Sequence, residues 1–204
     1  MSIIVDKISY TYEIGTGFER QALKEVSCVI EKGEFIGLIG HTGSGKSTLV
    51  NLIVRFYDVT DGKILIDGVN IKDYKLEYLY KLIGYVPQRA VLFNGTVNSN
   101  ISYGEAMEKI SDKKIVEASK VAQADEFISK MDDGYESHIA QGGTNISGGQ
   151  KQRIAISRAI AKNPEIYIFD DSFSALDYKT DAVLRSELKK YTKKDKDLVD
   201  IMFM

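Results

Sequence analysis

The feature that most constrains this chain is a glycine-rich turn at residues 40–47, with the sequence GHTGSGKS. Glycines let the backbone turn so that successive N–H groups converge on one anion. The run before the turn, residues 34–39, is short and apolar like a strand, and residues 46–56 carry apolar side chains at helical spacing. A helix that starts there adds partial positive charge beneath the anion. A glycine turn that arose by chance is the alternative, but the strand–turn–helix setting favours a phosphate-binding loop.

This turn matches the P-loop pattern of proteins that bind nucleoside triphosphates. In that pattern the lysine, here Lys46, reaches the β- and γ-phosphates, and the hydroxyl of Ser47 holds Mg²⁺. The sequence therefore predicts ATP and Mg²⁺ as ligands. The nucleotide-binding residues expected in the turn and the first helical turn are Gly40, Thr42, Gly43, Ser44, Gly45, Lys46, Ser47 and Thr48.

The remaining apolar runs predict an α/β fold. We expect strands at residues 3–12, 26–30, 34–39, 63–66, 83–86 and 166–169. We expect helices at residues 46–56, 76–82, 148–161 and 178–191, and mostly helical structure over 96–131, with a cap at Ser111 and Asp112. Because residues 166–169 are all apolar, their strand is expected inside a parallel sheet covered on both faces. Ligands bind at the carboxyl ends of such strands.

Composition excludes several classes of protein. The 204 residues fit one domain, and a net charge of −2 provides no overall field to attract nucleic acid or anionic lipid. The one cysteine, Cys28, alternates with apolar neighbours, which favours a buried, unreactive thiol. No run approaches the roughly 20 apolar residues that span a bilayer, and the N-terminus has no signal-peptide pattern. We therefore expect any membrane connection to run through a partner or through a segment outside this chain.

Four further motifs accompany the turn in a fixed order. They are VPQ at 86–88, ISGGQ at 146–150, IYIFDD at 166–171 and SALD at 174–177. Together with the turn they resemble the nucleotide-binding domain of ABC transporters, as its Q-loop, signature, Walker B strand and D-loop. The resemblance covers residues 3 to about 192. The segments LFNGTV at 92–97 and QGGTN at 141–145 look like the exporter branch, particularly multidrug and peptide half-transporters.

The resemblance implies a P-loop NTPase fold with a RecA-like core and a mostly parallel sheet. It also implies an antiparallel β region at the N-terminus and a helical subdomain inserted at about 90–148, all within a domain that spans residues 1–192. Residues 193–204 do not resemble the family and are expected to form an atypical tail.

Site roles follow from the same resemblance. Tyr12 matches the aromatic residue that stacks on adenine, although a strand tyrosine packed on the core is the alternative. Gln88 matches the residue that touches Mg²⁺, senses the γ-phosphate and lies where the membrane domain docks. Asp170 is the expected Mg²⁺ partner through water. The signature residues expected on the ATP of a second domain are Ser147, Gly148, Gly149 and Gln150; the D-loop comprises Ser174, Ala175, Leu176 and Asp177.

One departure from the family concerns catalysis. The residue after Asp170 is usually the glutamate that polarises the attacking water, but here it is Asp171. Its carboxylate falls short by up to about 1.5 Å, and a misplacement of about 1 Å can cost on the order of a hundredfold in rate. We therefore expect Asp171, with Gln88 and Lys46, to form a site that hydrolyses ATP slowly. An aspartate that works through a shifted water is the alternative.

A second departure concerns the C-terminus. The family has a further strand there that ends in a switch residue, usually histidine, but the only histidines are His41 and His138. In related folds that strand lies between the P-loop and Walker B strands. The C-terminal strands are therefore expected to be missing. Two alternatives stay open: residues 198–204 form a substitute strand, or the chain belongs to a longer reading frame.

The sequence thus predicts an ATP-binding subunit or fragment of an ABC exporter, on the cytoplasmic face of the membrane. Its expected partners are an ABC transmembrane domain and a second nucleotide-binding domain, in a heterodimer where this chain carries the degenerate site. The alternative is a regulatory module that binds ATP, hydrolyses little and dimerises with an active ATPase. Nucleic acid is not expected as a partner, because paired cassettes, coiled-coil insertions and basic arms are lacking. A P-loop kinase would leave the signature without a role.

Overall fold

The computed structural model describes residues 1–104, 110–193 and 199–203, which divide into two compact units. The first contains residues 1–85, 165–170 and the strand at 199–203. The second contains the described parts of 86–164 and 171–193. None of the helices in these described ranges is long and apolar enough to cross a membrane.

An antiparallel sheet forms one layer of the first unit. It comprises β1 (Ile3–Tyr12), β2 (Arg20–Ile30), β4 (Asp61–Ile66) and β5 (Val69–Asn70), in the order β2-β1-β4-β5. Side chains of β1 alternate between buried and partly exposed, as expected for a strand with one covered face. The predicted antiparallel region at the N-terminus is therefore present, and β2 is longer than the predicted 26–30. Cys28 on β2 is half-buried, and this burial raises the pKa of its thiol.

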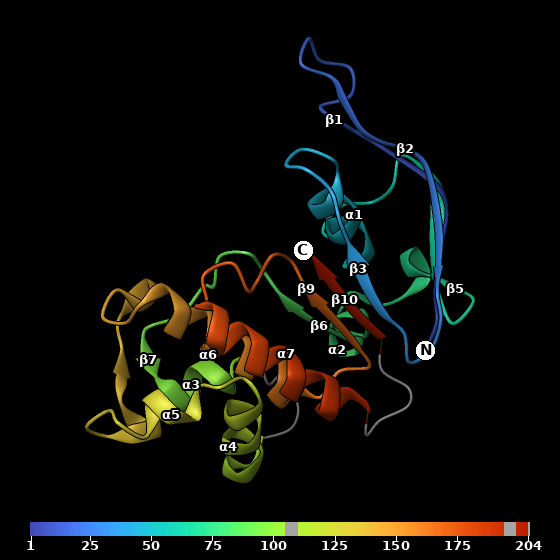
Figure 1. The fold of residues 1–204 in the computed structure, drawn as a ribbon. Coiled ribbons are helices and arrows are strands. Elements are labelled where there is room, and N and C mark those ends of the chain that lie inside the picture. Colours follow the sequence, from blue (N-terminus) through green and yellow to red (C-terminus); the bar gives the residue numbers. More distant parts are fainter. Residues whose placement is uncertain (105–109, 194–198, 204) are drawn as a thin grey trace. The chain divides into compact units, whose positions relative to one another are not determined.

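The second sheet contains the strand that leads into the P-loop. Its order is β3 (Phe35–Leu38), β10 (Val199–Phe203), β9 (Ile166–Phe169) and β6 (Ile83–Val86). Strand β10 is parallel to both neighbours, with Ile201 opposite Ile36 on β3 and Ile168 on β9 (Figure 1).

The predicted loss of C-terminal strands is therefore not confirmed. The backbone of residues 199–203 lies between β3 and β9, the place that the family's further strand would take. Strand pairing uses backbone N–H and C=O groups, so a segment without the family's sequence can still fill it. This outcome fits the substitute-strand alternative; positions 198 and 204 lie outside the described residues.

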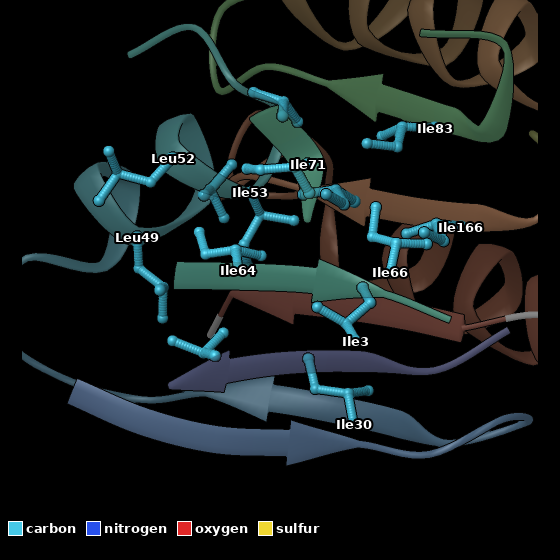
Figure 2. Close-up of a cluster of buried hydrophobic side chains, with 14 of the residues drawn as sticks. Ile3, Ile30, Leu49, Leu52, Ile53, Ile64, Ile66, Ile71, Ile83 and Ile166 are labelled. Atoms are coloured by element: carbon cyan, nitrogen blue, oxygen red, sulfur yellow. The ribbon is translucent and has the colours of Figure 1, made fainter. Parts of the chain in front are cut away.

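The core of the first unit holds the helix that follows the P-loop. Helix α1 (Lys46–Ile53) contributes Leu49, Leu52 and Ile53 to the same buried cluster as the isoleucines of β4, and Ile53 lies beside Ile64 (Figure 2). Each of these side chains is at least nine-tenths buried, and each contributes about 1.5–3 kcal/mol of burial free energy. The helix ends earlier than the predicted residue 56, because Arg55 adopts a left-handed φ of 57°. Its guanidinium donates to the carbonyls of Ile71 and Tyr74.

Between β5 and β6 along the chain, the first unit also contains a short 3₁₀ turn, η1 (Ile71–Asp73), and α2 (Leu76–Leu82). Helix α2 has its predicted bounds. The buried residues Leu79 and Leu82 of α2 join the same core as α1.

Helices dominate the second unit. They are α3 (Val97–Ile101), α4 (Asp112–Val121), α5 (Asp125–Ile128), α6 (Gly148–Lys162) and α7 (Tyr178–Lys193). Two 3₁₀ turns, η2 (Gly134–Glu136) and η3 (Gln141–Gly143), and a small pair of strands, β7 (Gly95–Thr96) and β8 (His138–Ile139), complete it. Of the predicted helical stretch 96–131, residues 105–109 lie outside the described residues, and the described part contains three short helices. Ser111 precedes α4 without a capping side-chain hydrogen bond.

Candidate nucleotide-binding site

The P-loop turn lies directly against strand β2. Gly43 and Gly45 have left-handed φ values of 84° and 90°, and the N–H of Ser44 donates to the carbonyl of His41 at 3.1 Å. A Cβ on Gly45 would come within 2.7 Å of a methyl group of Leu23. Both the conformation and the close approach therefore require glycine at position 45.

The start of α1 is positively charged and uncapped by side chains. Gly45 is its N-cap residue, and the first turn carries no acidic side chain. The ammonium of Lys46 donates to the carbonyls of Gly40 and His41, so it lies over the loop. A helix N-terminus with free N–H groups beside a lysine fits a phosphate group.

A hydroxyl and a carboxylate meet beside this loop. Asp170 directly follows β9 and is 8% exposed, and the Ser47 hydroxyl donates to its Oδ1 at 3.1 Å. Mg²⁺ prefers such hard oxygen ligands and takes the rest from substrate phosphates and water. The described residues contain no group of three or more acidic, histidine or cysteine side chains that could hold a metal ion.

Tyr85 on β6 also contacts this carboxylate, a relationship that sequence patterns did not predict. Its hydroxyl donates to Oδ2 of Asp170 at 3.4 Å. Burial, reinforced by the negative charge of Asp170, raises the pKa of Tyr85 to about 12. The sequence around Tyr85 does not predict this contact, because Asp170 is 85 residues away along the chain.

Tyr12, at the end of β1, contacts the first turn of α1 and therefore lies beside the predicted phosphate-binding loop. Its hydroxyl is 3.1 Å from the hydroxyl of Thr48, and its ring packs edge-to-face on Tyr10 with 4.8 Å between ring centroids. Tyr57, which is 47% exposed, completes a cluster of three tyrosines. The core contact and the position beside the loop agree with both predicted roles of Tyr12, so adenine stacking stays a prediction.

In the second unit, Gln88 and Asp171 are direct partners. The Gln88 amide Nε2 donates to Oδ2 of Asp171 at 2.7 Å. Asp171 has a left-handed φ of 48°, a conformation that is uncommon outside glycine, and its carbonyl accepts from the hydroxyl of Ser174 at 2.9 Å. The two residues predicted to act on the γ-phosphate and on the attacking water are thus joined to each other.

The signature segment forms a second helix N-terminus. Ser147 caps α6 in a capping box: its hydroxyl oxygen accepts from the N–H of Gln150 at 3.2 Å, and the Gln150 side chain accepts from the Ser147 N–H at 2.9 Å. Because the hydroxyl oxygen accepts here, its own hydrogen can point to a ligand. The first turn of α6 carries no acidic residue.

The two signature glycines have different surroundings. A Cβ on Gly149 would lie 3.2 Å from the carbonyl oxygen of Ala175, so α6 approaches the D-loop backbone closely. A Cβ on Gly148 would meet nothing within 4 Å, so Gly148 faces open space at the end of α6. The packing of the chain explains glycine at 149, whereas no described contact requires glycine at 148.

The D-loop aspartate has a local structural role. Both oxygens of Asp177 accept from Thr180, the backbone N–H at 3.0 Å and the hydroxyl at 2.7 Å, which caps α7. These hydrogen bonds lower the pKa of Asp177. Ser174 and Ala175 are exposed, and Leu176 is partly buried.

The structure therefore brings the predicted residues together in two groups. The P-loop residues, Tyr12 and Asp170 belong to the first unit. Gln88, Asp171, the signature and the D-loop belong to the second. Buried polar residues such as Ser172 and Gln152, which bond the Q-loop backbone, went unpredicted because their partners are distant in sequence.

Comparisons with known proteins agree with these motifs. The protein family described as ABC transporter matches residues 23–174. An uncharacterized ABC transporter ATP-binding protein of Mycobacterium tuberculosis is 46% identical over 182 residues, 89% of this chain and 30% of that protein. The ATP-dependent lipid A-core flippase of Haemophilus ducreyi is 43% identical over 91% of this chain and 31% of its own length.

A solved structure extends the similarity to the fold. A bacterial Atm1-family ABC exporter with ATP bound superposes with a TM-score of 0.91 at 35% identity, over 99% of this chain and 34% of that chain. The chain thus spans about a third of the length of these relatives. It belongs to the ABC transporter family and is an ATP-binding domain of the exporter type.

Proposed function

We propose that this chain is the ATP-binding part of an ABC exporter, in which Mg-ATP binding, dimer closure and hydrolysis drive transport across a membrane. Relatives named as a lipid A-core flippase and a putative multidrug export protein support this role. Since the chain spans about a third of these relatives, the transport step requires an ABC transmembrane domain, with this chain on the cytoplasmic face.

The first unit binds the nucleotide. The loop N–H groups, the N-terminus of α1 and Lys46 bind the phosphates, while Tyr12 stacks on the adenine. Ser47 and Asp170, whose side-chain oxygens lie 3.1 Å apart, hold Mg²⁺ in this unit. Magnesium, when bound, neutralises charge on the β- and γ-phosphate oxygens.

The single observation that carries the proposal is a second helix N-terminus in the same chain that fits an anion. Helix α6 begins with Gly148 and Gly149, helix α1 follows Gly45 as its N-cap, and neither helix carries an acidic side chain in its first turn. A protein that only binds ATP needs one such site. Ser147 and Gly148 therefore serve an ATP held by another domain, which makes the nucleotide part of a dimer interface.

Asp171 defines this chain's own role within that dimer. Its side chain is shorter than the family's glutamate and is engaged by Gln88. We expect slow hydrolysis at the site built on this P-loop, and a heterodimer in which the intact signature completes the partner's active site. The regulatory module that hydrolyses little is the second candidate, and the same Gln88–Asp171 contact favours it.

The experiment compares Gly148→Ala with Gly17→Ala, since both glycines have open space around the missing Cβ and neither needs a left-handed φ. Each chain carries both a P-loop and a signature, so two copies can pair in place of the heterodimer. Slow hydrolysis lets ATP persist, so wild-type chains at high concentration are expected to dimerise with Mg-ATP in sedimentation velocity. Gly148→Ala should lose this dimer while its monomer still binds Mg-ATP, and Gly17→Ala should keep both. A wild-type chain that stays monomeric with saturating Mg-ATP, or a Gly148→Ala dimer of equal strength, contradicts the proposal. Phosphate release measured on the same samples separates the exporter ATPase from the regulatory module.

A further inference from the structure

The tyrosine cluster, formed by Tyr10, Tyr12 and Tyr57, extends from the core of the first unit to its surface. Tyr10 is 9% exposed and belongs to the buried core, Tyr12 packs partly buried against that core, and Tyr57 is 47% exposed. Because side chains alternate along a strand, Tyr10 and Tyr12 lie on the same face of β1. Tyr57 comes from another part of the chain, the segment that follows α1.

The C-terminal end of α1 turns the chain just before Tyr57. The N–H of Arg55 donates to the carbonyl of Leu52 at 3.1 Å, and the N–H of Phe56 donates to the carbonyl of Asn51 at 2.8 Å. With the left-handed φ of 57° at Arg55, these two bonds form a Schellman motif, which ends a helix. The guanidinium of Arg55 donates to two backbone carbonyls and so holds this turn. The position of Tyr57 is therefore fixed by the local backbone.

The ring of Tyr12 contacts three groups. Its centroid lies 4.8 Å from that of Tyr10 at an interplanar angle of 89°, and 6.2 Å from that of Tyr57 at 78°. Both are edge-to-face contacts, an arrangement that aromatic pairs favour. The third group is the hydroxyl of Thr48, 3.1 Å from the hydroxyl of Tyr12. The centroids of Tyr10 and Tyr57 lie 5.8 Å apart, so each ring of the cluster contacts the other two.

The contact with Tyr57 restrains Tyr12 at the surface of the first unit. Tyr10 and Thr48 are each 9% exposed and hold Tyr12 from its buried side, whereas Tyr57 lies where the chain meets solvent. A side chain that is already held in its binding position gives higher affinity, because binding then has less to order. Loss of the Tyr57 ring would leave Tyr12 restrained from the buried side alone.

We propose that Tyr57 is a positioning residue for the nucleobase: its ring packs edge-to-face against Tyr12 and fixes the ring on which the base stacks. The contact is made between rings, so phenylalanine should replace Tyr57 without loss. This inference rests on the proposed function, which assigns base stacking to Tyr12. It assigns the affinity for the base to a pair of aromatic residues from β1 and from the segment after α1.

The test uses two substitutions of Tyr57 and a matched control. Tyr57→Leu removes the ring and keeps an apolar side chain, while Tyr57→Phe keeps the ring and removes the hydroxyl. Tyr78→Leu is the control, because Tyr78 is 55% exposed and stacks on a tyrosine outside the cluster, Tyr74, with 5.9 Å between centroids. Thermal unfolding verifies that each variant folds.

Titration calorimetry compares Mg-ATP with magnesium tripolyphosphate, which has three phosphates but neither base nor ribose. Tyr57→Leu should bind Mg-ATP about three- to tenfold more weakly and tripolyphosphate with wild-type affinity. Tyr57→Phe and Tyr78→Leu should match the wild type for both ligands. A general structural defect would instead weaken both ligands alike, so an equal loss for Mg-ATP and tripolyphosphate in Tyr57→Leu overturns the proposal.

A double-mutant cycle with Tyr12→Ala tests whether Tyr57 acts through Tyr12. In the Tyr12→Ala background, Tyr57→Leu should change the affinity for Mg-ATP by less than about twofold. A loss as large as in the wild-type background overturns the proposal, because Tyr57 would then act independently of Tyr12. Unchanged affinity of Tyr57→Leu also overturns it. Should Tyr57→Leu fail to fold, Tyr57→Phe decides, since a loss beyond about threefold in that variant contradicts a role of the ring.

The same titrations separate this inference from the proposed function. A wild type that binds Mg-ATP, with a Tyr57→Leu variant of equal affinity, overturns the role of Tyr57 and leaves the proposed function standing. If Tyr12→Ala binds Mg-ATP as tightly as the wild type, base stacking on Tyr12 and the role of Tyr57 fall together, while phosphate binding by the P-loop stands. If the wild type does not bind Mg-ATP, the proposed function falls as well.

Discussion

The Gln88 amide and the Asp171 carboxylate form a 2.7 Å hydrogen bond within the second unit. The Asp171 backbone is left-handed, and its carbonyl accepts from the hydroxyl of Ser174. Ser174 therefore holds the backbone of Asp171, while Gln88 holds its carboxylate. A carboxylate held in this way occupies the amide of the glutamine that is predicted to sense the γ-phosphate. Asp171, which stands where the family usually has glutamate, therefore also engages the predicted phosphate sensor.

Replacing Asp171 by glutamate should raise hydrolysis. The longer side chain restores about 1.5 Å of reach, and correcting a misplacement of about 1 Å is worth on the order of a hundredfold. We expect Asp171→Glu to increase steady-state phosphate release by about this factor in ATP-dependent dimers, with Asp171→Asn as the inactive control. If wild type and Asp171→Glu release phosphate equally fast, the aspartate works through a shifted water and the degenerate-site proposal is wrong.

The ring of Tyr12, rather than its hydroxyl, should determine nucleotide affinity. Loss of a base-stacking aromatic costs about 1–3 kcal/mol, so Tyr12→Ala should weaken Mg-ATP binding by roughly tenfold or more. Tyr12→Phe removes only the contact with Thr48 and should bind within about threefold of the wild type. Titration calorimetry measures both. Equal affinity of Tyr12→Ala and the wild type would assign Tyr12 to the core contact with Tyr10 alone.

The short strand β10 should be essential for the first unit. It supplies the backbone partners of both β3 and β9, and the two strands it joins lead directly to the P-loop and Asp170. A chain that ends after residue 193 should lose its cooperative urea transition and its Mg-ATP binding. The matched control ends after Phe203 and should unfold like the full chain. A stable, nucleotide-binding protein that lacks residues 194–204 would show that β10 contributes little.

Tyr85 should make the protein less stable at alkaline pH. Its pKa is raised to about 12 from an ordinary value of 10.0, so the folded state keeps a proton that the unfolded state loses. Stability is therefore full below about pH 10 and falls as the pH rises toward about 12. Urea unfolding at pH 9, 10 and 11 should show a smaller decline in Tyr85→Phe. Some decline should remain in Tyr85→Phe, because the pKa of Tyr135 is also raised to about 12. If the free energy of unfolding falls equally steeply with pH in the wild type and in Tyr85→Phe, the assignment to Tyr85 is wrong.

Much of the fold follows from local sequence patterns. The P-loop turn, α2, β6 and β9 have local signals, namely glycine chemistry, helical spacing and continuous apolar runs, and the structure places them where those signals predict. The antiparallel region and the exporter-type family assignment, which came from the motifs, are also confirmed.

Most of the features that sequence patterns missed depend on distant partners. The pairing of β10 is decided by the backbone edges of β3 and β9, more than 30 residues away. The break of the 96–131 stretch follows from short local geometry, such as the left-handed Gln123 (φ 56°) after α4. The contacts of Tyr85, Gln152 and Arg158 join residues at least 58 positions apart, and no pattern along the chain encodes them.

The affinity of the folded chain for Mg-ATP most directly tests whether the P-loop binds the nucleotide. This affinity is compared between the wild type, Lys46→Ala and Lys75→Ala. Lys46 lies over the P-loop carbonyls, whereas Lys75 precedes α2. Hydrogen bonds to charged groups are worth about 1.5–3 kcal/mol. We therefore predict roughly ten- to hundredfold weaker binding in Lys46→Ala and wild-type binding in Lys75→Ala. A folded wild type without affinity for Mg-ATP, or a Lys46→Ala variant that binds as tightly as the wild type, would contradict it.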